Sequence, residues 1–385
     1  MSSAAEAPAA PTRSDPPPLS RNRALAVWVL VVVAGLLMAA SSLTIWVKRQ
    51  ALDTDAWTNA SGQMLANDEI RQQLSIYLVD TLFSSTDATT KIQEALPPER
   101  AALAPIIAGA LRNVSVTMAN RLLSTPQAQT LWEEANRRAH ENLLAVLNGE
   151  SVRRFNTEDG TVVLDLSAVA QQLSDRLGVQ APPDAGRITI LKSGELKTAQ
   201  RTLKVVKVLS VFLLLLVLFL YGLAIYLARG HRRRILRAVA VSFLFVGVLI
   251  LVIQRVGGDW VIDNLVRTDA QRPAGQAAWT IGTALLREVA IAIILYGAIG
   301  LFASWVAGPT RLAVAARVRL APAFRDQPWV VYGVIAFLFL LVIAWGPTPA
   351  TREWWGILLL GGLVFFGVAM LQRQTVNEFP AATKA

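Results

Sequence analysis

Long apolar runs with almost no charged residue dominate the pattern of this chain, and they recur six times. Each is long enough to cross a bilayer as a helix, because about 20 residues span a hydrocarbon core of ~30 Å. A helix also satisfies its own backbone hydrogen bonds in lipid. The six predicted spans are residues 24–47, 205–228, 238–254, 289–307, 329–345 and 354–372. The expected fold class is therefore mainly α, a six-helix transmembrane protein.

Residues 48–204 separate the first two spans and are long enough to form a folded domain. Helical periodicity dominates its first part. Asn67 is a predicted N-cap, and the helix after it is expected to bury an apolar face. That face comprises Ile70, Leu74, Leu78 and Leu82, and Ile76, Val79 and Phe83 widen it, so burial on more than one side is expected. Pro97-Pro98 is expected to break the chain before another segment that runs to about residue 124.

A further helix is predicted from Thr125-Pro126, a cap followed by proline at the first helical position. Its expected apolar face repeats every four residues, and His140 is expected on the opposite, polar face. The face comprises Leu131, Ala135, Ala139, Leu143 and Leu147. Asn148-Gly149 is expected to end the helix.

The pattern then changes to short β-type runs. Residues 160–165 and 187–191 predict two strands that could form a small hairpin or strand pair, with a helix at 167–177 between them. From Glu195 a helix is expected to continue without a break into the second span, since no glycine or proline interrupts it before Gly222.

The distribution of charge predicts the orientation. The chain has 37 Lys+Arg against 27 Asp+Glu, but residues 48–204 are balanced, with 17 basic and 18 acidic residues. The excess lies in both termini and in two short connections, at 229–237 and 311–325, which the positive-inside rule places in the cytoplasm. We expect cytoplasmic tails at 1–23 and 373–385, a cell-membrane location and an extracytoplasmic domain at 48–204. The pI of about 10.4 then reflects topology and is no sign of nucleic-acid binding.

The first span has an alternative interpretation as a cleaved signal peptide. Its apolar core is longer than the ~7–15 residues of such segments, although the small residues at 39–41 are compatible with a cleavage site. An uncleaved anchor is the favoured interpretation. Residues 1–20, rich in Ala, Pro and Ser, predict a disordered tail.

Composition also restricts the chemistry. The chain has no Cys and 2 His, which argues against disulfides, thiol catalysis and Cys or His metal sites. No nucleotide, metalloprotease or nucleophile motif is present, so no enzyme activity, cofactor or metal is predicted. Asp259 and Asp263 share one helical face, but Gly257-Gly258 suggests a loop there, and a solvated face is favoured over a cation site.

Two groups of residues are candidate sites. Lys197, Arg201 and Lys204 fall on one face of the helix that enters the second span, where they would contact anionic lipid headgroups or serve as ordinary flanking charges. Arg287 and Glu288 precede the fourth span and form a candidate polar pair at membrane depth, with a surface charge pair as the simpler alternative. The basic segment 310–324 is expected to lie on the cytoplasmic leaflet.

Three stretches carry a resemblance to a known family. They are Leu131 to His140, Gly160 to Ser167 and Arg229 to Arg234. They resemble a family of uncharacterised multi-span integral membrane proteins of high-GC Gram-positive bacteria, across residues 24–372. The resemblance implies a membrane location and no particular activity or functional residue.

Two functions are compatible with these features. The first is a non-enzymatic envelope protein held in the lipid bilayer, whose outer helical domain binds an envelope lipid, a wall component or a partner protein. The alternative is an export permease, because one span, a large outer domain and five more spans resemble one class of ABC-type permease subunits. A permease of that class would need a separate ATPase, since this chain carries no ATPase motif.

Overall fold

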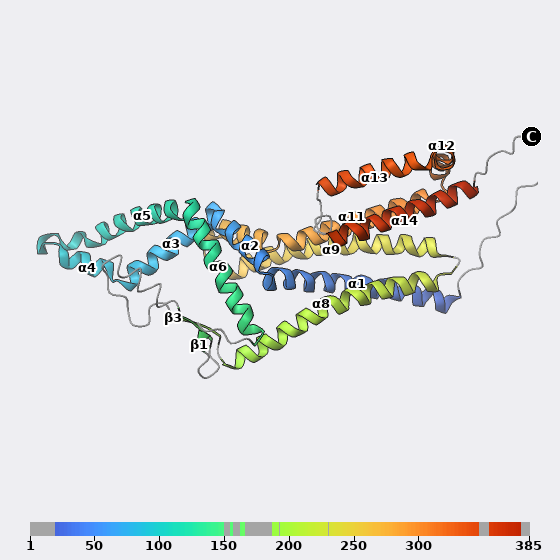
Figure 1. Cartoon of the computed structure of the whole chain (residues 1–385). Helices are drawn as coiled ribbons and strands as arrows, with labels where there is room; N and C mark the ends of the chain where they lie inside the picture. The colour runs from blue at the N-terminus through green and yellow to red at the C-terminus, as the bar shows by residue number, and fades with distance from the viewer. Residues whose placement is uncertain are drawn as a thin grey trace, which may run out of the picture. The chain divides into compact units, whose positions relative to one another are not determined.

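The fold is known from a computed structural model, which describes residues 20–149, 155–156, 162–165, 187–191, 193–229, 231–345 and 354–378. The protein is mainly α-helical (Figure 1). Its first helices are α1 (Arg21–Leu52), α2 (Thr54–Ala66), α3 (Asp68–Ser85), α4 (Ala88–Ala95), the 3-10 turn η1 (Pro98–Leu103), α5 (Ala104–Leu123) and α6 (Pro126–Leu147). Those that follow are α8 (Ser193–Leu227), α9 (Arg232–Leu265), η3 (Asp269–Gln271), α10 (Arg272–Gly282), α11 (Ala284–Val306), α12 (Arg311–Asp326), α13 (Pro328–Trp345) and α14 (Trp354–Glu378).

Within the described residues, five helices are long and apolar enough to cross a membrane, or six if a bent pair counts as one span. Four of them, α1, α8, α9 and α11, contain the first four predicted spans. The bent pair is α12 with α13, with a bend of 111° at the break between them, and α13 contains the predicted fifth span. The remaining helix, η1 and α5 together, was not among the predicted spans. The sixth predicted segment, 354–372, is helical as part of α14.

Three short strands lie in the segment before α8. They are β1 (Phe155–Asn156), β2 (Val162–Asp165) and β3 (Arg187–Leu191), which pair antiparallel in the order β1-β2-β3. In the register of the second pair, Leu164 lies opposite Ile188. The predicted helix at 167–177 lies outside the described residues. The helix predicted from Glu195 is confirmed, because α8 continues unbroken to Leu227.

The chain divides into two compact units, to which α1, α8, α9 and α11 each contribute a part. We call residues 1–39, 213–249 and 290–385 the bundle, and residues 40–212 and 250–289 the helical domain. In the bundle, α9 and α11 approach closely at Gly297, where an added Cβ would lie 2.8 Å from Leu244 N. Tyr221 of α8 and Ser242 of α9 share a hydrogen bond of 3.0 Å between their hydroxyl groups. Small residues and interhelical hydrogen bonds of this kind are the usual means of packing helices in lipid.

Side chains from three other helices cap the C-terminal end of α11 in the bundle. Arg317 of α12 is 1% exposed and donates to the carbonyl oxygen of Gly308 at 2.7 Å. Its Nε also binds Glu378 of α14 at 2.9 Å. Arg233 of α9 donates to Ser304 O at 3.2 Å. Carbonyl groups that have no partner inside their own helix are thereby satisfied.

The helical domain is built from pairs of neighbouring helices. The most extensive contacts join α2 with α6 and α3 with α5, and α10 packs against both α2 and α3. The predicted caps are confirmed, since Asn67 Oδ1 accepts from Ile70 N at 3.1 Å and Thr125 Oγ1 accepts from Ala128 N at 3.3 Å. The predicted end of α6 is also confirmed, at Asn148, and Gly149 has a φ of +84°.

The segment around Gly257-Gly258 is helical, so the loop predicted there is wrong. Trp279 of α10 packs against α9 at this point, and a Cβ on Gly258 would lie 2.6 Å from Trp279 Nε1. The indole donates to Gln254 O at 3.1 Å, and Gln254 Nε2 donates to Thr283 Oγ1 at 2.7 Å. Gly258 therefore provides space for the side chain of Trp279 from another helix, and it is not part of a turn.

Candidate functional site

An apolar stripe is exposed along α5, beginning at the last residue of η1, and we call it the α5 stripe. Its seven large side chains are between 40% and 69% exposed. They are Leu103, Ile106, Ile107, Leu111, Val114, Met118 and Leu122. Most follow one another at steps of three or four residues, which places them on one side of the helix. Contiguous exposed apolar surface of this kind usually marks an interaction site.

The neighbouring helix α3 also exposes large apolar side chains, and this corrects the predicted face. Leu78 is 45% exposed and Leu82 is 58% exposed, although both belong to the face that was expected to be buried. Of the predicted apolar side chains, Val79 is buried as expected, and the other buried side chains of α3 are Arg71 and Ser75. The prediction failed because α3 contacts α5, α2 and α10 through a face that includes an arginine and a serine, both with hydrogen-bond partners.

Arg71 holds the α3–α5 pair against the end of α2. It is 9% exposed, and its Nη1 donates to Ala66 O at 3.1 Å. Its Nε reaches Asn120 Oδ1 of α5 at 3.5 Å, and Asp68 forms an ion pair with it. A buried guanidinium is tolerated only when its donors are satisfied, and the partners here come from three helices.

A second ion pair ties α3 to α5. Arg112 Nη2 donates to Asp80 Oδ2 at 2.8 Å. The hydrogen bond from Arg112 lowers the pKa of Asp80 below its usual range, more than the slight burial of the carboxylate raises it. The carboxylate therefore stays ionised at neutral pH and keeps the pair intact.

The seam between α2 and α6 is formed by aromatic and polar residues. His140 is 3% exposed, so its expected place on a polar surface is wrong. Its ring stacks on Trp57 with centroids 5.0 Å apart, and its nitrogens lie 3.1 Å from Thr54 Oγ1 and 3.2 Å from Ala51 O. Leu131, by contrast, is 67% exposed. The face of α6 toward α2 is thus shifted by one residue from the predicted leucine–alanine row.

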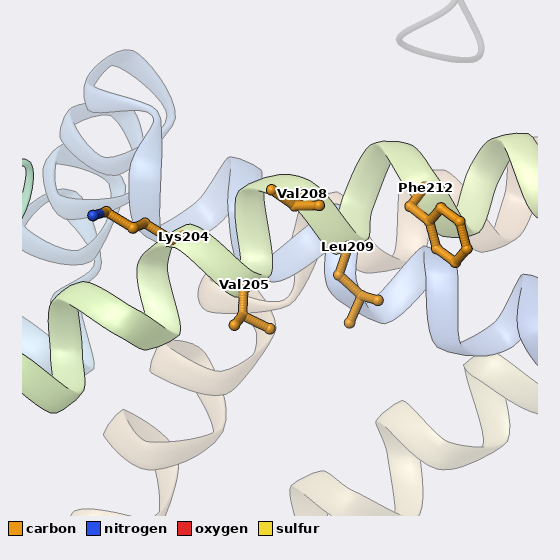
Figure 2. A pocket seen from close by; sticks show the side chains of 5 residues that line it. All are labelled: Lys204, Val205, Val208, Leu209 and Phe212. Atoms are coloured by element: carbon orange, nitrogen blue, oxygen red, sulfur yellow. The ribbon is translucent and has the colours of Figure 1, made fainter.

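The basic residues predicted on α8 are all exposed. Lys197, Arg201 and Lys204 form no ion pair with a described residue, and Lys204 borders a shallow, open apolar hollow along α8 (Figure 2). The other lining residues are Val205, Val208, Leu209 and Phe212. The exposed surface of α8 therefore changes from basic to apolar between Lys204 and Phe212, with Lys207 the last basic residue, as expected where a helix enters a lipid layer.

The second predicted pair does not form a contact. Arg287 is exposed and Glu288 is half-buried in the first turns of α11, and no ion pair joins them. Asp263 of the acidic pair binds Arg272. Across the described residues, no group of three or more acidic or histidine side chains could hold a metal ion.

Comparisons with known proteins add no function. The chain matches no known protein family, no curated protein and no solved structure at a significant level of similarity. The α5 stripe was missed in the sequence because the segment 98–124 was assigned no exposed face. Its composition carried a signal, since only two of the residues 104–123 are charged, Arg112 and Arg121.

Proposed function

We propose that this protein is a multi-pass membrane protein of the cell envelope whose helical domain binds an apolar partner through the α5 stripe. The proposal includes the predicted topology, with the helical domain on the extracytoplasmic side and both termini in the cytoplasm. The apolar helices and the asymmetry of basic residues support this topology. The carrying observation is the row of seven apolar side chains that remain exposed on a packed helix.

The packing of α5 argues against a membrane-spanning role for this helix. It lies along α3, whose residues Asp68, Glu69 and Asp80 would then enter the hydrocarbon core at a cost of several kcal/mol. α2 packs against α6. These are the helices that come before α3 and after α5 in the chain. A single crossing by α5 would place them on opposite sides of the bilayer. We therefore assign α5 to a domain outside the bilayer. There the hydrocarbon core cannot bury its apolar face, so we propose that a bound partner does.

The basic row Lys197, Arg201 and Lys204 fits the same arrangement. Its side chains are exposed at the point where α8 becomes apolar, so we propose that they lie at the level of the lipid headgroups. The permease alternative has no supporting observation. The hollow along α8 is apolar and open, whereas a transport site would need polar groups near the middle of the bilayer.

Labelling of single cysteines tests the proposal, because the natural chain has none. Val114→Cys and Met118→Cys lie on the stripe, and Thr130→Cys on the exposed surface of α6 is the matched control. In intact cells a membrane-impermeant maleimide should label the Thr130→Cys variant at least about tenfold faster than the two stripe variants, whose thiols their partner covers. Equal rates at all three positions would show that the stripe is open to water, and the proposed binding function would be abandoned.

A further inference from the structure

The α5 stripe has the dimensions and chemistry of an interface between two copies of this chain. We propose that two copies associate through it, an inference that rests on the proposed function and names its partner. The steps from Leu103 to Leu122 are four, four, three, four and four residues. Steps of three and four residues keep these side chains near one side of the helix, where a second helix can pack against them.

The exposed area suits a dimer. Seven side chains that are 40–69% exposed, with about 100 Å² free on each, offer roughly 700 Å², near the ~800 Å² that each partner buries in a stable interface. The neighbouring Tyr77, Leu78 and Leu82 of α3 are also exposed.

The charges around the stripe favour a second copy over a lipid surface. Helices that lie on a bilayer usually combine a Lys- or Arg-rich polar face with Trp or Phe on the apolar face. α5 contains no Lys, Trp or Phe, and Arg112, one of its two arginines, is neutralised by Asp80. Residues 68–123 carry five basic and six acidic side chains. Two such surfaces therefore meet without strong repulsion, and neither is attracted to anionic lipid.

Insertion in a membrane further favours the pairing of identical copies. All copies lie in one plane with the same orientation, so the effective concentration of one stripe near the stripe of another copy is raised. The same patch would meet itself across a two-fold axis, so the assembly closes as a dimer and exposes no further stripe. The spans need no additional contact of their own for this association.

Crosslinking of the full-length protein in native membranes tests the dimer. Crosslinking requires a cysteine that lies near its own copy across the two-fold axis. Three positions along the stripe are therefore tested, Leu111→Cys, Val114→Cys and Met118→Cys, and Thr130→Cys again serves as the control. Treatment with a short bis-maleimide should give a covalent dimer at one or more stripe positions, in at least about tenfold higher yield than at position 130. No excess over the control at any of the three positions would overturn the dimer.

A charged variant provides the second measurement. The double variant Val114→Asp with Met118→Asp should weaken association at least about tenfold, read as the mass of the protein in lipid nanodiscs by light scattering. Asn113→Asp adds a negative charge beside the stripe and should leave the dimer intact. Circular dichroism shows whether each variant is folded. An unchanged dimer in a folded double variant would overturn the proposal.

The two proposals fail in different ways. If the natural protein is monomeric while the stripe cysteines are slow to react with maleimide, the stripe is covered by something else. Crosslinking to a photoactivatable phosphatidylcholine in vesicles would then identify lipid as the cover, which overturns the dimer and leaves the proposed function intact. A monomer whose stripe reacts as fast as position 130 overturns both.

Discussion

Individual buried polar residues determine how the helical domain packs. Arg71 and His140 are 9% and 3% exposed, and each joins its own helix to another through hydrogen bonds. Residue type alone places arginine and histidine on the surface, because an unpaired polar group is costly to bury. The partners that remove this cost, such as Ala66 O and Thr54 Oγ1, lie far away along the chain or depend on where a helix ends.

We expect His140→Ala to destabilise the helical domain by about 2–4 kcal/mol, since it removes a stacked ring and leaves a cavity beside an unpaired Thr54 hydroxyl. Thermal unfolding of the detergent-solubilised protein, followed by tryptophan fluorescence, measures the change. Glu141→Ala, one residue further along and exposed, should shift the melting temperature little. Similar shifts for the two variants would contradict the packing of His140.

The Asp80–Arg112 pair predicts a small dependence of stability on pH. The pKa of Asp80 is lowered in the folded protein, so the pair stabilises the fold above the unfolded-state pKa of about 3.9. This contribution is lost as the pH falls through the lower folded-state pKa. Because the Asp80 side chain is 47% exposed, Asp80→Asn should cost at most about 1 kcal/mol at pH 7.

Urea unfolding at pH 7 and below pH 3 checks this expectation. The difference between the natural protein and Asp80→Asn should disappear at the lower pH. Adding Arg112→Gln to Asp80→Asn should cost little further stability at pH 7, because the pair is already broken. A difference that grows as the pH falls would contradict the assigned direction.

At the scale of the helices, local signals predicted the ends of elements well and their faces poorly. The Asn67 and Thr125 caps and the end of α6 at Asn148 are where the sequence placed them. These signals act over three or four residues and need no tertiary contact. The predicted buried face was wrong for α6 and only partly right for α3, where Val79 is buried but Leu78 and Leu82 are exposed. Packing partners select which face is buried, and more than one row of residues on each helix is apolar enough to be selected.

The close contact of α9 with α10 gives a matched pair of glycine variants. Gly258→Ala would place a Cβ 2.6 Å from Trp279 Nε1, whereas the nearest atom to a Cβ at Gly257 is 3.7 Å away. We expect Gly258→Ala to destabilise the protein by about 1–3 kcal/mol through overpacking. Gly257→Ala should be neutral or stabilise it by up to about 1 kcal/mol through helix propensity.

Thermal unfolding of the two variants, followed by circular dichroism, tests this difference. If both alanine variants gain stability, the packing of Trp279 against α9 is wrong.

At the scale of the whole molecule, the apolar helices limit the number of membrane spans, but they do not determine which of them cross or in which direction. The described residues contain five or six candidate spans, and α5 is apolar enough to be one of them although its packing with α3 argues against it. The orientation rests on the clustering of arginines in the connections 229–237 and 311–325.

The proposed orientation predicts opposite labelling of two exposed positions. In intact cells, an impermeant maleimide should react with Thr130→Cys in the helical domain and spare Arg319→Cys in α12. After permeabilisation both variants should react. Labelling of the Arg319→Cys variant before permeabilisation would show that the basic connections face outward and would reverse the topology.

The sequence by itself determined the class of this protein. Apolar length identifies helices that could cross a membrane, because transfer into lipid depends on each segment's own composition. Only the tertiary structure decided which faces are buried, that α9 stays helical past Gly257, and that α5 keeps an apolar stripe exposed. These outcomes depend on contacts between residues far apart in the chain, which no local pattern encodes.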